Sequence, residues 1–484
     1  MSARTGREYI EGLSATPREV WIGRECVSDP ATYPGFQGGI RSVAALYDMQ
    51  HDPELRGETT YPSPSFGDPV GLSFLTPRNA DDLLRRRRMM DLWARSSGGM
   101  LGRTPDYLNS AFMAMAAAAP FFEQGDPRWA ENILRYYEHI REHDLVLTHS
   151  LINPQADRSA APDREPNEHL SAGIVAETAD GLVIRGARLL ATLGPLADEI
   201  AVFPSTSRAP QAGEDDRFAF AFAIPCTTPG LRFLCRDSFD TGGSTADHPL
   251  GSRYEEMDAV VVFDDVLVPW ERVFIRRNPQ LCNEVFAHTN AVVHMAYQVV
   301  VKNVVKSEFL VGVASLMAET VSISQFPHVQ EKIAEMLICL ETMKACLRAS
   351  EADAELDEWG VFTPAWQPLN TARNVFPRMY PRMVEIVQLL GASGLMAAPS
   401  ADLLDTPVAD DVRKYLRAAN ADAEERMRLY RLAWDLSCSS FGSRQVLYER
   451  FFFGDPVRMA GALYSSYNKQ PLMDAVRAFL ARED

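Results

Sequence analysis

The fold is decided by a series of short apolar runs: GIVAET (173–178), LVIRGARLL (182–190), EIAVF (199–203), RFAFAFAIP (217–225), LRFLC (231–235) and DAVVVF (258–263). Each run is rich in β-branched residues or alternates in polarity, which is the pattern of a β-strand. Asp180 and Gly181 separate the first two runs and predict a hairpin turn. This part of the chain therefore predicts a small β-domain with mostly antiparallel strands.

Helices are expected on both sides of this β-domain. Upstream, Asp126 followed by Pro127 predicts a helix start. Downstream, helical periodicity runs through three long segments: 294–320, 328–356 and 375–390. The order predicts an α+β protein of three parts: an N-terminal helical domain (1–150), a middle β-barrel-like domain (151–278) and a C-terminal helical bundle with a tail (279–484).

Composition excludes several classes of function. The 484 residues carry 48 basic and 65 acidic side chains, a net charge of −17, which argues against nucleic acid or an anionic membrane as partner. The longest apolar runs, 111–122 and 292–301, are shorter than the roughly 20 residues that span a bilayer. The seven scattered cysteines contain no Cys-x-x-Cys pair, and the N-terminus has no signal-peptide pattern, which predicts a cytoplasmic protein with reduced thiols.

Two local patterns allow alternative interpretations. His139 and His143 lie in HIREH (139–143), which matches a His-x-x-Glu-His zinc-hydrolase pattern, although the polar flanks equally fit a helix surface. The arginine run 85–88 fits either a solvated helix face or a nuclear-localisation signal. The chain contains no Gly-x-Gly-x-x-Gly, Walker loop or Gly-x-Ser-x-Gly elbow.

Three residues are candidates for acid–base or electrostatic chemistry. Arg103 and Tyr107 are four positions apart around Pro105, so on a helix both side chains could approach one bound oxygen. Spacing alone favours a plain helix N-terminus with Asp106 in its first turn. His149 stands in an apolar context before the polar Asn-Pro-Gln turn (153–155) and is a candidate base or a satisfied core histidine.

Seven segments together resemble one known family: GRTPDY (102–107), LTHSLINPQADR (147–158), ATLGPLADEI (191–200), DDVLVPWERVF (264–274), HVQEKIAEM (328–336), QLLGASGL (388–395) and FFGDPVRM (452–459). They look like the oxygenase component of 4-hydroxyphenylacetate 3-hydroxylase. The resemblance runs in order along nearly the whole chain, which makes it more specific than any single motif.

The resemblance implies a fold, a reaction and partners. The family's fold is acyl-CoA dehydrogenase-like, and its members are homotetramers. They are monooxygenases that use FADH2, supplied by a separate NAD(P)H-dependent flavin reductase, with O2 as co-substrate. A C4a-hydroperoxyflavin then hydroxylates a phenolic ring ortho to its hydroxyl group. The substrate expected here is a phenol, free or carrier-bound, that the sequence does not specify further.

The resemblance also implies roles for individual residues. Arg103, Tyr107 and His149 would surround the phenol hydroxyl, with His149 also close to the flavin. The implied flavin-binding residues are Gln155, Asp157, Arg158, Thr192, Gly454, Asp455, Pro456, Val457 and Arg458. Pro204 and Ser205 would begin a substrate-covering loop that runs to residue 217.

Two alternative hypotheses assume the same acyl-CoA dehydrogenase-like fold. A 4-hydroxybutyryl-CoA dehydratase would need an iron–sulfur cluster held by three cysteines and a histidine, but no cysteine lies between Cys26 and Cys226. A non-catalytic oligomeric scaffold is the other reading. The joint presence of Arg103, Tyr107, His149 and Thr192 argues against it.

Overall fold

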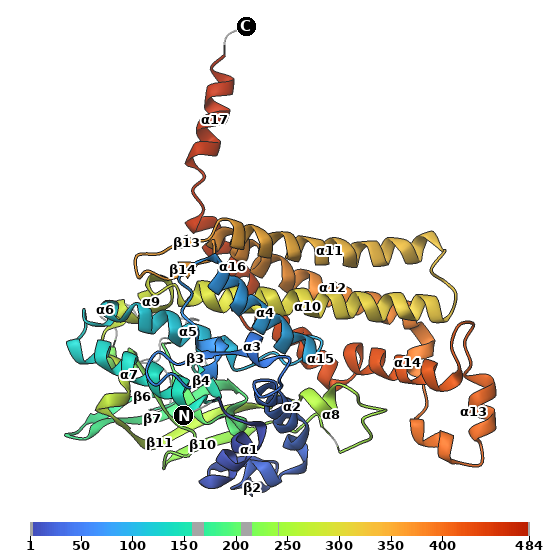
Figure 1. Cartoon of the computed structure of the whole chain (residues 1–484), viewed down its shortest axis with the longest axis horizontal. Helices are drawn as coiled ribbons and strands as arrows, with labels where there is room; N and C mark the ends of the chain where they lie inside the picture. The colour runs from blue at the N-terminus through green and yellow to red at the C-terminus, as the bar shows by residue number, and fades with distance from the viewer. Residues whose placement is uncertain (1–2, 157–168, 205–214, 241, 483–484) are drawn as a thin grey trace.

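The computed structural model describes residues 3–156, 169–204, 215–240 and 242–482. Its first part is mainly helical (Figure 1). The helices are α1 (Gly6–Ala15), α2 (Gln37–Asp48), α3 (Arg56–Thr59), α4 (Ala80–Ser96), α5 (Asp106–Ala117), α6 (Ala119–Phe122) and α7 (Pro127–His143). The predicted start of α7 is confirmed, because the Asp126 side chain accepts from the Arg128 amide and Pro127 lies in the first turn.

The β-domain consists of two sheets with mostly antiparallel pairing, as expected. One sheet has six strands in the order β2-β1-β10-β11-β7-β6, and the other has four in the order β12-β9-β8-β5. The middle of the chain supplies β6 (Gly173–Glu177), β7 (Gly181–Thr192), β8 (Glu199–Val202), β9 (Phe220–Pro225), β10 (Leu231–Cys235), β11 (Asp258–Pro269) and β12 (Val273–Arg276). β6 and β7 form the predicted hairpin.

Three strands of these sheets come from the mainly helical first part. They are β1 (Glu19–Ile22), β2 (Glu25–Val27) and β5 (Leu147–Ser150). β1 pairs in parallel with β10, and β5 pairs in parallel with β8. The β5 pairing brings His149 opposite Ala201, so the candidate base is fixed by sheet hydrogen bonds rather than by a loop.

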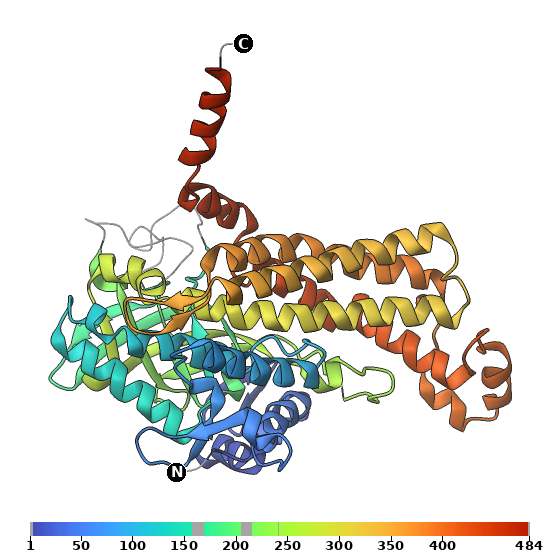
Figure 2. The same cartoon turned by 45° about the horizontal axis from the view of Figure 1, so that its top comes forward.

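Long helices dominate the last part of the chain, and three of them lie side by side (Figure 2). They are α10 (Ala291–Thr320), α11 (Pro327–Ala352) and α12 (Trp366–Met396). Shorter helices complete this part: α9 (Pro279–His288), α13 (Ala409–Tyr415), α14 (Ala423–Ser437), α15 (Ser440–Phe451), α16 (Pro456–Ser466) and α17 (Gln470–Leu480). A further short helix, α8 (Gly251–Tyr254), lies in the β-domain between β10 and β11. Two small hairpins, β3–β4 (Thr60–Pro62, Pro69–Gly71) and β13–β14 (Glu355–Leu356, Phe362–Thr363), lie outside the main sheets.

α15 is tied to α10 by buried charges. Lys302 and Lys306 of α10 donate to the same Glu449 oxygen at 2.5 and 2.7 Å, and all three side chains are essentially inaccessible. Removing one partner of such a buried ion pair typically costs about 3–5 kcal/mol. The pairing therefore fixes the position of α15 against the bundle.

One described stretch, Trp366–Asp405, is long and apolar enough to cross a membrane by length and composition alone. Its helical part, α12, packs against α10 and α11 in the bundle. The buried side of α12 includes Leu369, Phe376 and Tyr380. One face of α12 therefore packs inside the bundle, while only 33% of the most apolar stretch of residues 366–405 is buried.

Candidate active site

A cavity of about 750 Å³ lies where the six-stranded sheet and β5 meet α15. It is lined by Arg103, His149, Leu151, Ile152, Leu190, Thr192, Arg236, Phe239, Asp258, Cys438, Ser440, Ser443, Arg444, Leu447, Tyr448, Phe451 and Phe452. The lining is largely apolar with a few charged groups, and the volume is in the range of sites for small molecules and cofactors.

The structure brings Arg103, Tyr107 and His149 together as expected. The Arg103 guanidinium carbon lies 4.3 Å from the centre of the Tyr107 ring. The Tyr107 and His149 rings are 5.8 Å apart. Arg103 and His149 line the cavity, whereas Tyr107 is 3% exposed and lies against both. The arginine precedes α5, the tyrosine lies in its first turn and the histidine comes from β5.

A close contact with Tyr448 explains why residue 102, immediately before Arg103, is a glycine. The Tyr448 hydroxyl donates to the Gly102 carbonyl at 3.0 Å. A Cβ atom at Gly102 would lie 2.7 Å from the Tyr448 ring, so no larger residue fits without displacing that ring. The contact holds the segment before α5 against α15 and directs Arg103 toward the cavity wall formed by Tyr448 and Phe452.

The Arg103 guanidinium is buried without a full set of partners. Among the described residues, its Nε and Nη1 atoms have no hydrogen-bond acceptor. The nearby carboxylate of Glu256 is already occupied, since it accepts from the Arg103 backbone amide at 2.5 Å and from Arg444 at 2.5 Å. A buried cation with unused donors costs free energy unless an anion completes it, so Arg103 is prepared for an anionic ligand atom.

His149 is held in its neutral form. The side chain is 6% exposed. Burial, and then the positive charge of Arg103, place its pKa well below the ordinary value. A neutral imidazole can accept a proton, and an anion formed in the cavity would in turn favour the imidazolium. His149 is therefore competent as a base for a group that ionises beside Arg103.

Thr192 joins a charged network on the opposite strand. Its hydroxyl donates to Asp258 Oδ1 at 2.8 Å. The same carboxylate accepts from Arg444 at 2.8 and 2.9 Å and from Arg236 at 3.0 Å. Burial alone would raise the Asp258 pKa, but Arg444 and Arg236 outweigh it and hold the pKa below its usual range. Both arginines and Thr192 line the cavity.

Several expected site residues either do not line this cavity or lie outside the described part of the chain. Gln155 is exposed at the end of a described segment, and Pro204 is buried just after β8. Asp157, Arg158 and Ser205 lie outside the described residues. The segment containing Gly454, Asp455, Pro456, Val457 and Arg458 starts α16, where Asp455 caps the helix and Val457 is 79% exposed. It follows Phe451 and Phe452, which do line the cavity, with Phe453 between them and Gly454.

The zinc interpretation of His139 and His143 is wrong for the described residues. His143 Nδ1 faces the His139 carbonyl oxygen at 2.9 Å, and His139 Nε2 lies 3.3 Å from Glu199. Glu199 is in turn paired with Arg272 at 2.7 Å. Within the parts of the chain that the structure describes, no three His, Cys, Asp or Glu side chains are grouped to hold a metal ion. The two histidines belong to the surface of α7.

Sequence reasoning missed the α15 wall of the cavity. The wall consists of Ser440, Ser443, Arg444, Leu447, Tyr448, Phe451 and Phe452. These positions recur at intervals of three and four, so they form one helix face, and Phe452 follows the last turn. The sequence signal that could have predicted this wall is an apolar helix face that contains one arginine and two serines. Arg236 and Asp258 had no such local pattern.

The fold and cavity define the class of protein. A solved archaeal 4-hydroxybutyryl-CoA dehydratase from N. maritimus has the same fold, with a TM-score of 0.87 at 20% identity over 100% of this chain and 96% of that chain. The predicted α+β, acyl-CoA dehydrogenase-like fold is thus confirmed. More narrowly, family models described as 4-hydroxyphenylacetate 3-hydroxylase N terminal and C terminal match residues 5–275 and 282–481. The chain therefore belongs to the 4-hydroxyphenylacetate 3-hydroxylase family.

Individual relatives agree with this assignment. The 4-hydroxyphenylacetate 3-monooxygenase oxygenase component of a Geobacillus species is 49% identical over 99% of this chain and 97% of its own length. A crystal structure of such an oxygenase component complexed with FAD and 4-hydroxyphenylacetate has a TM-score of 0.95, at 49% identity over 99% of this chain and 98% of that one.

Proposed function

We propose that this protein is the oxygenase component of a two-component, flavin-dependent monooxygenase that hydroxylates a phenolic ring ortho to its hydroxyl group. The observation that carries the proposal is the meeting of Arg103, Tyr107 and His149 at a largely apolar cavity, in a chain of this family. Its relatives are named as such oxygenase components, and one is solved with FAD and a phenolic acid.

The residues of the cavity fit a flavin together with a phenol. Its apolar walls suit flat aromatic rings, Thr192 supplies a hydroxyl, and the guanidinium groups of Arg103, Arg236 and Arg444 suit anionic groups. When bound, reduced flavin supplies the electrons that activate O2. Thr192 would contact the isoalloxazine ring, with Gln155, Asp157, Arg158 and the 454–458 segment as further cofactor contacts. Pro204 and Ser205 would contact the substrate.

The chain's own residues account for activation of the substrate. A phenolate ring is more electron-rich than a phenol ring and reacts faster with an electrophilic oxygen. The neutral His149 accepts the phenol proton, while Arg103 and the Tyr107 hydroxyl stabilise the oxyanion. Tyr107 and His149 are buried, and so are the Nε and Nη1 atoms of Arg103, which limits access of water to the reacting group.

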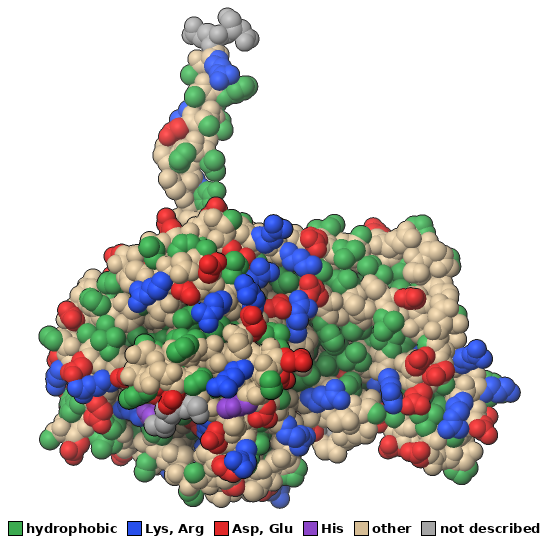
Figure 3. All heavy atoms as spheres, in the orientation of Figure 1, with side chains coloured by type: hydrophobic (Ala, Val, Ile, Leu, Met, Phe, Trp, Pro, Cys, Tyr) green, Lys and Arg blue, Asp and Glu red, His purple; other side chains and the backbone are tan. Residues whose placement is uncertain are grey.

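Self-association is part of the proposal, with a homotetramer as the expected assembly. α17 projects from the body of the protein (Figures 1 and 2). Its apolar side chains are exposed, as the space-filling view shows along this arm (Figure 3). They are Leu472, Met473, Val476, Phe479 and Leu480. An isolated helix of 11 residues with this exposed apolar surface is stabilised by packing against another chain.

The remaining parts of the proposal concern organisation and location. The separate reductase accords with the relatives' description as oxygenase components. The three-part division at residues 150 and 278 follows the change from helices to strands and back. A cytoplasmic location accords with seven free cysteines.

The test is a screen of phenolic acids with the purified protein, FADH2 and O2. Formation of a catechol, detected as a mass gain of one oxygen atom, is the expected result. Arg103→Met is the matched negative control, since it keeps the fold but removes the oxyanion partner. Absence of hydroxylated product with every phenol, under conditions where FADH2 binds, would contradict the proposal.

A further inference from the structure

The hydrogen bond between Thr192 and Asp258 determines whether the threonine hydroxyl can donate a hydrogen bond to a ligand in the cavity or can only accept one. Asp258 accepts from Arg444 through both carboxylate oxygens and from Arg236 through Oδ2. A carboxyl group surrounded by two guanidinium groups is ionised and has no proton to give. In the 2.8 Å contact with Thr192 Oγ1, the proton therefore belongs to the threonine.

A hydroxyl group has one proton and two acceptor lone pairs. Because the Thr192 proton is directed at Asp258, only the lone pairs remain for a ligand in the cavity. Turning the hydroxyl toward a ligand acceptor would break a charge-assisted hydrogen bond and leave two oxygen atoms facing each other at 2.8 Å. Thr192 is thus an acceptor and not a donor toward the cavity.

The backbone around Thr192 keeps this arrangement in place. The Thr192 carbonyl accepts from the Thr148 hydroxyl at 2.6 Å. The next residue, Leu193, adopts a left-handed conformation with φ 65°, and its amide donates to the Glu256 and Met257 carbonyls at 3.0 Å. The strand end is therefore held on both sides, which fixes the backbone from which the Thr192 side chain reaches Asp258.

The flavin ring distinguishes donors from acceptors at its N5 atom. N5 of oxidised flavin is a hydrogen-bond acceptor, whereas N5 of reduced flavin carries a hydrogen and is a donor. We propose that Asp258 is a specificity-determining residue that makes the site select reduced over oxidised flavin, by holding the Thr192 hydroxyl as an acceptor for the N5 hydrogen. This inference rests on the proposed function and adds a residue that acts through Thr192.

The consequence is a directional exchange of the cofactor. A site that accepts from N5–H binds the reduced flavin delivered by the reductase and holds the oxidised product more weakly. The expected difference in affinity is about tenfold, the contribution of one hydrogen bond compared with none. Selectivity at this position requires both the hydroxyl of Thr192 and the negative charge of Asp258.

The experiment compares dissociation constants for oxidised FAD and for dithionite-reduced FAD under anaerobic conditions. In Thr192→Val the hydroxyl is lost, so affinity for reduced FAD falls about tenfold while affinity for oxidised FAD changes little. In Asp258→Asn the new amide can donate to Thr192, which frees the hydroxyl to donate to N5, so affinity for oxidised FAD rises. Both changes lower the midpoint potential of bound FAD, by about 30 mV for each tenfold loss of selectivity.

Two controls separate this role from a structural one. Thr192→Ser keeps the hydroxyl and retains the wild-type ratio of affinities. Asp264→Asn makes the same chemical change on the same strand at a position paired with Arg232 on the exposed side of the sheet, and also keeps that ratio. A purely structural role would weaken binding of both flavin forms alike.

An unchanged affinity ratio in Thr192→Val overturns the inference while leaving the proposed function intact. If Asp258→Asn does not fold, Thr192→Val decides the question, and failure of both to fold assigns the pair to stability and also overturns the inference. A wild-type protein that binds neither form of FAD contradicts the proposed function itself.

Discussion

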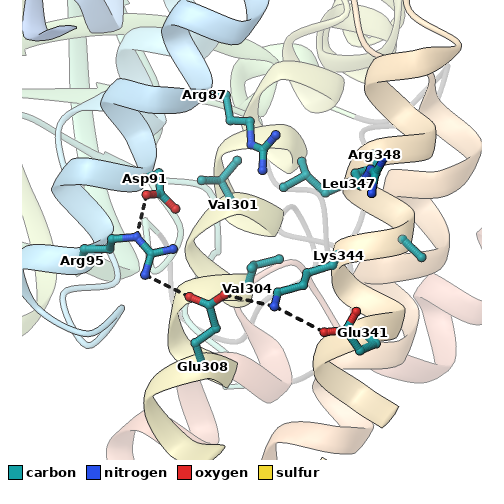
Figure 4. A pocket seen from close by; sticks show the side chains of 11 residues that line it. Arg87, Asp91, Arg95, Val301, Val304, Glu308, Glu341, Lys344, Leu347 and Arg348 are labelled. Atoms are coloured by element: carbon teal, nitrogen blue, oxygen red, sulfur yellow. Dashed lines mark hydrogen bonds and ion pairs between the residues drawn. The ribbon is translucent and has the colours of Figure 1, made fainter. Parts of the chain in front are cut away.

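Two of the arginine-lined hollows that the described residues form differ in whether a central arginine, Arg95 in one and Arg103 in the other, is already paired. The surface hollow, about 280 Å³ between α4, α10 and α11, contains a continuous chain of ion pairs (Figure 4). Arg95 bonds Asp91 at 2.6 Å and Glu308 at 2.9 Å, and Lys344 bonds Glu308 at 3.2 Å. In the cavity at α15, by contrast, Arg103 is buried with two nitrogen atoms that have no acceptor among the described residues.

The comparison shows why the number of arginines in a hollow does not identify a site. Exposed ion pairs contribute little to stability, and the guanidinium of Arg95 is already engaged by Asp91 and Glu308. A buried guanidinium with unused donors is costly, so the fold keeps it only where another group completes it. The four predictions below test this difference, beginning with the largest expected effect.

Replacing Arg103 by Met should reduce kcat/KM for catechol formation about 1000-fold, because the phenolate loses its buried cation. Reduced FAD should still bind, and the unfolding temperature should not fall, since no ion pair of the guanidinium group is broken. The measurements are product formation, FADH2 binding and thermal unfolding. Arg95→Met in the surface hollow is the matched control and should leave kcat/KM within about twofold. Equal losses in both variants would refute the distinction between the two hollows.

His149→Ala should slow hydroxylation about 100-fold, since the proton acceptor is lost. FADH2 binding should remain nearly intact, because the catalytic contribution of the imidazole concerns the phenol. Single-turnover hydroxylation and FADH2 binding are the two measurements. His143→Ala, at the surface of α7, is the control and should behave like the wild type. Loss of FADH2 binding in His149→Ala would instead make His149 a structural or cofactor residue.

The pH dependence of hydroxylation should reflect the lowered pKa of His149. A histidine with a depressed pKa stays neutral, and so remains able to accept a proton, as the pH falls through the ordinary value of about 6.5. The profile of kcat/KM between pH 5.5 and 8, a range chosen around that ordinary value, should therefore show no acid limb centred near 6.5. A limb at that pH in the wild type that disappears in His149→Ala would contradict the buried, neutral state.

The smallest effect is expected for the stability of Arg95→Met. Arg95 is half exposed, and exposed ion pairs contribute about 1 kcal/mol or less to the free energy of unfolding. Chemical denaturation at low and high salt measures this free energy, and the small difference from wild type should shrink as salt rises. A loss of several kcal/mol would show that the ion pairs of the surface hollow contribute as much to stability as buried ion pairs do.

Much of the fold was predictable because its signals are local. Alternating runs gave the strands, and a capping residue with proline gave the start of α7. The long helices were expected at 328–356 and elsewhere, but α11 ends at Ala352, because the chain there turns into the β13–β14 hairpin. The arginine run 85–88 is only partly a solvated face. Arg86 is 1% exposed and donates to Ser110 at 2.6 Å.

The candidate site was predictable in part for the same reason. Arg103 and Tyr107 are close in sequence at one helix start, so their spacing allowed their meeting but also fitted a plain helix N-terminus; the family resemblance supplied the expectation. Asp258, Arg236 and Arg444 meet only because β10, β11 and α15 converge in three dimensions. No spacing along the chain encodes that convergence. The pairing state of each arginine, which distinguishes the two hollows, likewise emerges only from the folded structure.

In this cavity, the side chains of α15 that shape the wall are largely different from the side chains that would act on the substrate. Leu447 and Phe451 line the cavity from α15 and are 59% and 47% exposed, whereas Arg103, Tyr107 and His149 come from other elements. Substitutions on this one helix face can therefore change which ring enters without disturbing the groups that ionise it. A library restricted to these two positions, with Arg444 and Tyr448 kept, is a compact starting point for redirecting the enzyme to bulkier phenols. The fold thus places a wall that tolerates substitution next to a reaction centre built from other elements.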